Sequence, residues 1–171
     1  MNSTRLNIMH GIAYLAAIAC SSAYAESGIY GYGVNEGGDV KLYSPVDCVV
    51  AGTNQSYINY SAGRALNPTS SAKPFYCPIT ADVLTLTGGH IYLLDTNIIY
   101  NFTCQLRSQA PTSTSYIYSS VTTSGESTTP VKKTFSSSSY YTDTNRYIYC
   151  SVPGTYEPTT DLCLIYPYEC K

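Results

Sequence analysis

The sequence predicts an all-β protein: a single antiparallel β-sandwich, jelly-roll-like or immunoglobulin-like, with about 8–10 short strands and stabilising disulfides. Three observations predict this fold. Short segments rich in β-branched and aromatic residues are separated by clusters of Gly, Pro, Ser and Asn. No stretch shows the 3.6-residue hydrophobic period of a helix. Six of the seven cysteines follow a predicted export signal, which indicates a disulfide framework.

The strongest predicted strand covers residues 98–107, which contain neither Gly nor Pro. Side chains alternate between the two faces of a strand, so alternate positions share a face. The apolar face consists of Ile98, Tyr100, Phe102, Cys104 and Leu106. The other face is polar, with Ile99 as the exception. A strand that is apolar at five alternate positions is expected to pack against a second layer.

Further strands are predicted at 40–43, 46–51, 57–60, 74–79, 83–86, 91–94, 145–152 and 162–166. Residues 87–90, Thr-Gly-Gly-His, are predicted to form the hairpin turn between two of them. Pro78 has no N–H group to donate, so its strand is expected to lie at a sheet edge or to end there.

Residues 108–144 are ambiguous because 20 of these 37 positions are serine or threonine. This composition is typical of a glycosylated or disordered stalk. However, residues 116–121 and 131–135 keep the spacing of strands, and threonine suits the solvated face of a sheet. We therefore expect two outer strands in this region.

The first 25 residues are predicted to be a signal peptide. Arg5 precedes an apolar run at 8–19 that is too short to span a bilayer. Ala23-Tyr-Ala25 provides the small-x-small cleavage site. Cleavage before Cys20, as in a lipoprotein, is an alternative, although such sites prefer Leu where Ala17 stands.

Cleavage after Ala25 would leave 146 of the 171 residues, which is the length of one domain. The predicted division is a signal peptide at 1–25, a glycine-rich N-terminal arm or edge strand at 26–45, and the β-sandwich at 46–171. We therefore expect a secreted, periplasmic or cell-surface protein.

Six cysteines remain after cleavage, and six allow 15 connectivities. The working hypothesis pairs Cys48 with Cys77, Cys104 with Cys150, and Cys163 with Cys170. Cys104 and Cys150 each lie on the apolar face of a predicted strand. We therefore expect these two thiols to meet across the interior, between the stacked layers.

Charge and composition argue against several classes of partner and cofactor. Charged residues are 12% of the chain, and the predicted mature part has 8 Lys and Arg against 11 Asp and Glu. This balance argues against nucleic acid and against electrostatic attachment to anionic membranes. No later segment is long and apolar enough to span a membrane. There is no C-x-x-C pair for zinc, so neither a metal nor another cofactor is expected.

Tyrosine is unusually abundant, with 19 residues and no tryptophan. Many tyrosines are two residues apart, which puts them on one face of a strand: Tyr30/Tyr32, Tyr116/Tyr118, Tyr147/Tyr149 and Tyr166/Tyr168. These rings either edge the core with their hydroxyls in water or form an exposed aromatic stripe for sugars, a partner chain or a surface. The candidate binding residues are Tyr116, Tyr118, Tyr147 and Tyr149.

The sequence predicts no catalytic site. A nucleophilic triad needs a histidine, and the predicted mature chain has only His90, in a predicted turn. No G-x-S-x-G motif is present. Five carboxylates are of the type that glycosidases use, but all lie in or beside predicted turns: Asp82, Asp95, Asp143, Glu157 and Asp161.

Four segments together resemble a group of small secreted bacterial proteins of unknown function: Tyr76-Cys-Pro-Ile79, Phe102-Thr-Cys-Gln-Leu106, Tyr147-Ile-Tyr-Cys-Ser-Val-Pro153, and a late tyrosine before Glu169. The resemblance covers about Cys48 to Glu169 and implies a bacterial, exported β-sandwich with no assigned active site. Val152 stands where Leu is usual. Cys163 and Cys170 are additional to the pattern, which makes their mutual pairing the natural expectation.

Two functions remain as expectations. The first is an exported structural, adhesive or surface-interaction protein without catalytic activity. In that case the arm at 26–39 would add a strand to a neighbouring copy. The second is a monomeric carbohydrate- or ligand-binding module that uses exposed tyrosine faces.

Overall fold

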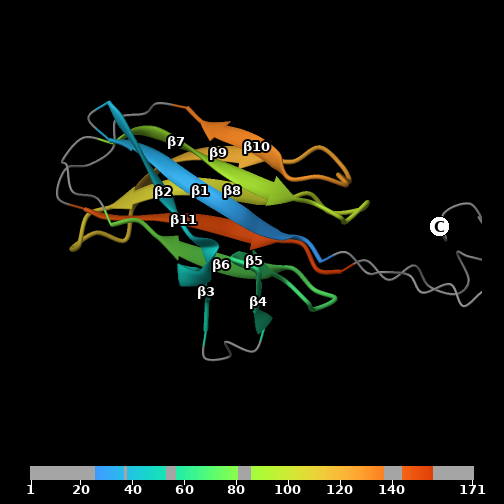
Figure 1. Ribbon diagram of the computed structural model, residues 1–171. Coiled ribbons are helices and arrows are strands. Elements are labelled where there is room, and N and C mark those ends of the chain that lie inside the picture. Colours follow the sequence, from blue (N-terminus) through green and yellow to red (C-terminus); the bar gives the residue numbers. More distant parts are fainter. Residues whose placement is uncertain (1–25, 37, 53–56, 81–85, 137–143, 156–171) are drawn as a thin grey trace, which may run out of the picture. The chain divides into compact units, whose positions relative to one another are not determined.

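The chain folds into two antiparallel β-sheets that pack as a sandwich (Figure 1). The computed structural model describes residues 26–36, 38–52, 57–80, 86–136 and 144–155. The predicted all-β sandwich is confirmed. Eleven strands occur in the described ranges, more than the predicted number, because three of them are only two or three residues long. No helix in these ranges combines the length and the hydropathy that crossing a bilayer requires.

The first sheet has six strands in the order β10-β7-β1-β5-β4, with β2 also paired to β1. Its strands are β1 (Gly28–Glu36), β2 (Asp39–Tyr43), β4 (Asn59–Ser61), β5 (Arg64–Leu66), β7 (Leu86–Leu94) and β10 (Val131–Phe135). The predictions for residues 40–43 and 131–135 are confirmed by β2 and β10.

Strand β1 lies inside the first sheet, with β7 on one side and β2 and β5 on the other. The prediction of an arm or edge strand at 26–45 is therefore wrong for Gly28–Glu36, whereas β2, in the described ranges, pairs with β1 alone. Glycine in β1 allows a neighbouring strand to approach its backbone closely. A Cβ atom at Gly28 would lie 2.8 Å from the Ala65 carbonyl oxygen.

The second sheet has the strand order β3-β6-β11-β8-β9. Its strands are β3 (Val49–Val50), β6 (Lys73–Pro78), β8 (Thr103–Gln109), β9 (Tyr116–Thr122) and β11 (Asn145–Val152). Strands β6, β9 and β11 confirm the predictions, and β6 ends at Pro78 as expected. The strand predicted at 46–51 is shorter, because Pro45–Asp47 forms a 3-10 turn before β3.

The first half of the strand predicted at 98–107 is instead a loop, and β8 begins at Thr103. The side chain of Asn97 redirects the backbone, because its Oδ1 atom accepts hydrogen bonds of 2.8 Å from the amides of Ile99 and Tyr100. Ile98 and Tyr100 are consequently 49% and 66% exposed. The second half of the apolar face is confirmed, since Phe102, Cys104 and Leu106 are fully buried.

The hairpin turn predicted at 87–90 does not form, because β7 runs through these residues as one strand. Gly88 has φ +135°, beside the irregularity where the register with β1 shifts. A Cβ atom at Gly89 would lie 2.6 Å from the Gly33 carbonyl oxygen. The two glycines therefore allow close pairing of β7 with β1. Residues 81–85 lie outside the described ranges.

The core lies between the two sheets and is made of side chains from both. Its largest fully buried members are Tyr32, Phe75, Phe102, Phe135, Ile29, Ile91, Leu93, Leu106 and Ile148. Phe75 comes from β6 and Phe135 from β10, so aromatic rings from both layers fill the interior.

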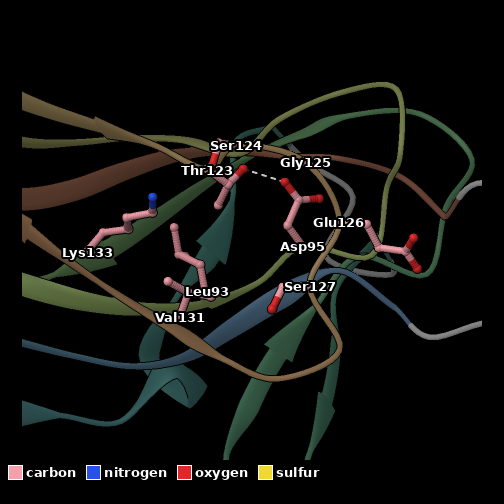
Figure 2. A pocket seen from close by; sticks show the side chains of 9 residues that line it. All are labelled: Leu93, Asp95, Thr123, Ser124, Gly125, Glu126, Ser127, Val131 and Lys133. Atoms are coloured by element: carbon pink, nitrogen blue, oxygen red, sulfur yellow. Dashed lines mark hydrogen bonds between the residues drawn. The ribbon is translucent and has the colours of Figure 1, made fainter.

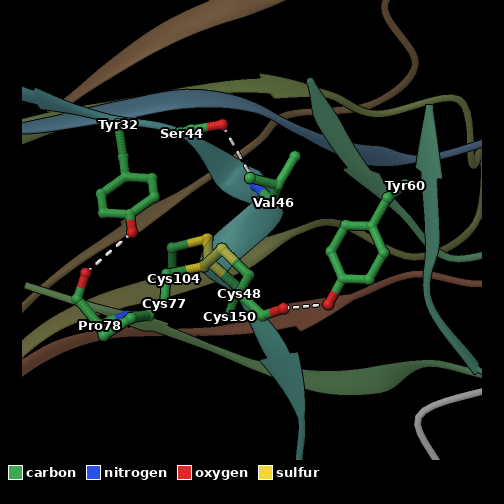
Figure 3. Close-up of a disulfide and its surroundings, with 9 residues drawn as sticks. All are labelled: Tyr32, Ser44, Val46, Cys48, Tyr60, Cys77, Pro78, Cys104 and Cys150. Carbon is green, nitrogen blue, oxygen red and sulfur yellow. Dashed lines mark hydrogen bonds between the residues drawn. A yellow bond between two sulfur atoms is a disulfide. The ribbon is translucent and has the colours of Figure 1, made fainter. Parts of the chain in front are cut away.

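Two of the three predicted disulfides are confirmed, Cys48–Cys77 and Cys104–Cys150 (Figure 3). Cys104 and Cys150 are direct partners in the pairing of β8 with β11. The prediction that this bond joins the two layers is therefore wrong, because both strands belong to the second sheet. Cys48 precedes β3, which pairs with β6, so the other bond also lies within that sheet. The predicted Cys163–Cys170 pair lies outside the described ranges.

Three tyrosines of the first sheet donate hydrogen bonds to backbone carbonyls in or beside the second. The Tyr32 hydroxyl donates to Pro78 O at 2.8 Å, and the Tyr43 hydroxyl donates to Thr80 O at 2.7 Å. The Tyr60 hydroxyl donates to the Cys48 carbonyl (Figure 3). Among the paired tyrosines, the interpretation that the hydroxyls lie in water is therefore wrong for Tyr32, which is 1% exposed. Burial raises the pKa of the Tyr32 phenol.

Candidate functional site: the tyrosine face

The outward side of the second sheet carries five tyrosines, which we call the tyrosine face: Tyr76 on β6, Tyr116 and Tyr118 on β9, and Tyr147 and Tyr149 on β11. Strand alternation produces this arrangement. Ile148 and Cys150 are fully buried, so their neighbours at alternate positions point outward. All four predicted candidate residues therefore lie on the same surface.

The five rings form two groups. On β6 and β11, the ring centroid of Tyr76 lies 5.2 Å from that of Tyr149 and 5.8 Å from that of Tyr147. On β9, the ring centroids of Tyr116 and Tyr118 are 5.7 Å apart. Contacts at these distances stabilise aromatic pairs by about 0.5–1.5 kcal/mol. Strand β8 lies between the two groups.

Arg107 on β8 joins the two groups of rings. Its guanidinium carbon lies 4.2 Å from the ring centroid of Tyr116 and 3.9 Å from that of Tyr149. Its Nε and Nη2 groups donate to Gln105 Oε1 at 2.8 and 2.5 Å. Arginine stacks well on aromatic rings because its guanidinium is planar and weakly hydrated. The ring contacts and the Gln105 bonds together orient this cation.

The tyrosine face is partly open to solvent. Tyr118 is 51% exposed and Tyr116 is 38% exposed, while the other three rings are half-buried. The Tyr147 hydroxyl donates to Gln109 Oε1 at 3.2 Å, so amide groups lie among the rings. Such a surface can stack on flat apolar ring faces and exchange hydrogen bonds with hydroxyl groups.

Sequence reasoning missed two members of this site, Tyr76 and Arg107. Both could have been found from alternation alone. Tyr76 lies between the inward Phe75 and Cys77, and Arg107 follows the inward Leu106. That both residues lie close to the candidate tyrosines could not be predicted, because this depends on which strands are neighbours in the sheet.

A separate cavity of about 160 Å³ lies where β7 ends and the β9–β10 connection passes (Figure 2). Asp95 is fully buried there. Its Oδ1 accepts a hydrogen bond from the Asn97 amide at 3.1 Å, and its Oδ2 accepts from the Phe102 amide and the Thr123 hydroxyl. These bonds organise the surrounding loops, which fits the predicted role of an acidic turn former.

His90 lies within β7 and is 7% exposed. Its ring makes an edge contact with Tyr92 at 5.6 Å. Burial lowers the pKa of the imidazole, and the charge of Lys132 lowers it further. The prediction that His90 lies in a turn is therefore wrong, and its side chain is buried rather than in solvent.

The other candidate carboxylates, Asp82, Asp143, Glu157 and Asp161, lie outside the described ranges. In the part of the chain that the structure describes, no cluster of three or more His, Cys, Asp or Glu side chains has the arrangement of a metal site.

No protein-family model matches the chain, and searches of curated proteins and of solved structures give no significant match. The resemblance to small secreted bacterial proteins therefore stays a prediction. Function is therefore inferred from the geometry of the tyrosine face.

Proposed function

We propose that this protein is an exported, non-catalytic surface-interaction module that binds carbohydrate on its tyrosine face. The observation that carries the proposal is the set of five outward tyrosines on one sheet, joined by Arg107. The apolar faces of sugar rings stack on aromatic rings, and amide groups between the rings can bond sugar hydroxyls.

The form of the site favours an extended ligand. Pockets for small molecules usually have volumes of about 300–1,000 Å³. The cavity beside Asp95 is smaller, at about 160 Å³. The tyrosine face instead extends over four neighbouring strands, from β6 to β9. A polysaccharide chain can contact several of these rings at once.

Two observations support the exported and non-catalytic parts of the proposal. The two disulfides are expected of an oxidising compartment such as the periplasm or the exterior. Two candidate catalytic groups lie in the described ranges. His90 is buried, and the Asp95 carboxylate is occupied by hydrogen bonds from the backbone amides of Asn97 and Phe102.

The structure does not support the competing expectation of self-association through residues 26–39. Most of that segment belongs to β1, which is already paired on both sides. A strand in the middle of a sheet has no free edge to offer a neighbouring copy.

The test is an array of neutral and acidic glycans probed with the disulfide-bonded protein and with Tyr118→Ala. We expect binding to a restricted set of glycans, weakened about 2- to 10-fold by the loss of one stacked ring. Tyr100→Ala is the matched control, because Tyr100 is 66% exposed but lies on a loop outside the second sheet. A wild-type protein that binds no glycan on the array would overturn the proposal.

A further inference from the structure

Arg107 is the one charged side chain at the outward positions of the described strands of the second sheet. Among the described residues, an ion pair joins Lys41 Nζ to Glu36 Oε2 at 3.2 Å, and it lies on the first sheet, away from Arg107. Arg107 therefore has no carboxylate partner among these residues. Because its surroundings are tyrosines and amides, it creates a local positive site on a chain whose formal net charge is −2.

The hydrogen bonds of Arg107 leave donors for a ligand. A guanidinium has five N–H donors and accepts no hydrogen bond. The bonds to Gln105 involve Nε and Nη2. The rings of Tyr116 and Tyr149 contact the guanidinium through their faces and accept no conventional hydrogen bond. The remaining N–H groups can bond an anionic oxygen, and their orientation is set before a ligand arrives.

A neutral sugar does not need this cation, because Arg107 bonds only Oε1 of Gln105 and leaves the amide N–H groups of that side chain for sugar hydroxyls. A fixed cation attracts an anionic ligand more strongly than a neutral ligand of the same shape. A charge-assisted bond between a guanidinium and a carboxylate is about twice as strong as a neutral hydrogen bond. An arginine that has no carboxylate partner among the described residues and lies between stacked rings therefore favours sugars that carry a carboxylate.

We infer that the tyrosine face selects acidic glycans, and that Arg107 bonds the carboxylate of a uronic-acid residue while the flanking tyrosines stack on the sugar rings. This inference rests on the proposed carbohydrate-binding function and narrows its ligand class.

The experiment compares uronic-acid oligosaccharides with the same oligosaccharides after methyl esterification, which removes the charge and keeps the ring. Three sources are used: polygalacturonate, alginate and hyaluronan. Titration calorimetry on the disulfide-bonded protein is expected to show at least one acidic oligosaccharide bound about 10-fold more tightly than its ester. Added salt is expected to reduce this difference.

Three variants assign the effect to Arg107. Arg107→Gln is expected to remove the preference for the acid while retaining binding of the ester, and Arg107→Lys is expected to retain part of it. Lys132→Gln is the charge-matched control, since Lys132 is exposed on β10 of the other sheet. Circular dichroism and thermal melting establish that the variants are folded.

The outcomes separate this inference from the proposed function. Glycan binding without any preference for the acid over its ester would overturn the inference and leave the carbohydrate-binding function intact. An unchanged preference in Arg107→Gln would also overturn it. Binding of no glycan, acidic or neutral, would overturn both.

Discussion

The environment of His90 illustrates how packing sets the charge state of a single side chain. A Cβ atom built at Gly33 would lie 2.9 Å from His90 Cε1 and 3.0 Å from Leu42 Cδ2. The imidazole and the leucine therefore fill the space that Gly33 leaves open on β1. Burial and the nearby charge of Lys132 keep the pKa of this imidazole below its ordinary value, which favours the neutral form.

This lowered pKa predicts a stability that depends on pH. The unfolded imidazole takes up its proton near pH 6.5, about its ordinary pKa, before the folded imidazole does. The contribution of neutral His90 is therefore fully present above that pH and is lost as the pH falls through it. In urea unfolding, we expect His90→Gln to lose less stability than wild type between about pH 7.5 and pH 5. Parallel pH profiles for the two proteins would contradict this prediction.

At the scale of secondary-structure elements, the pairing of β7 with β1 depends on the absence of a side chain at Gly89. A Cβ atom added at Gly89 would lie 2.6 Å from the Gly33 carbonyl oxygen, which is too close for two atoms that are not bonded. Gly89→Ala is expected to lower the free energy of unfolding by about 1–3 kcal/mol, because one backbone must move. Urea denaturation followed by circular dichroism measures this change.

Gly31→Ala is the matched control, since Gly31 lies on the partner strand β1. The contact that its Cβ atom would make is an ordinary one, 3.8 Å from Tyr92 Cδ2. We expect this substitution to change the stability by no more than about 0.5 kcal/mol. Equal losses for the two variants would show that the close approach at Gly89 is not the cause.

Strands with regular alternation could be predicted from the sequence. β11 begins and ends at the predicted residues, because Ile148, Cys150 and Val152 alternate along it as an apolar face. The loop before β8 could not be predicted, because the hydrogen bonds of Asn97 and Asp95 override the strand propensity of residues 98–100. The place of β1 inside the sheet could not be predicted either, since it depends on partners distant in sequence.

The same limit applies to the candidate site. Alternation alone predicted that Tyr147 and Tyr149 share a face. It failed for Tyr30 and Tyr32, because the register of β1 with β7 shifts between Ile29 and Gly31. A bulge of this kind changes which residues face the core, and local sequence does not show where it occurs. Predicting that Arg107 stacks on Tyr116 and Tyr149 would also have required the order of the strands in the sheet.

At the scale of the whole molecule, the two described disulfides connect strands of one layer. The sequence separations are 29 for Cys48–Cys77 and 46 for Cys104–Cys150. The loop-entropy model gives about 3.6 and 4 kcal/mol for such separations. We expect replacement of either pair by alanine to lower the free energy of unfolding by up to these amounts, and the two variants to differ by less than about 1 kcal/mol. Calorimetric melting of both variants measures the effect, and a loss below about 1 kcal/mol for either pair would contradict the prediction.

The covalent bonds and the aromatic surface belong to the same layer. The described cysteines point inward from the second sheet, and the tyrosines of the face point outward from it. In the described ranges, the disulfides restrict the separation of strands in the second sheet, whereas the short β4 and β5 of the first sheet are held by pairing and packing alone. A polysaccharide bound as proposed would therefore contact the layer whose strands are covalently connected.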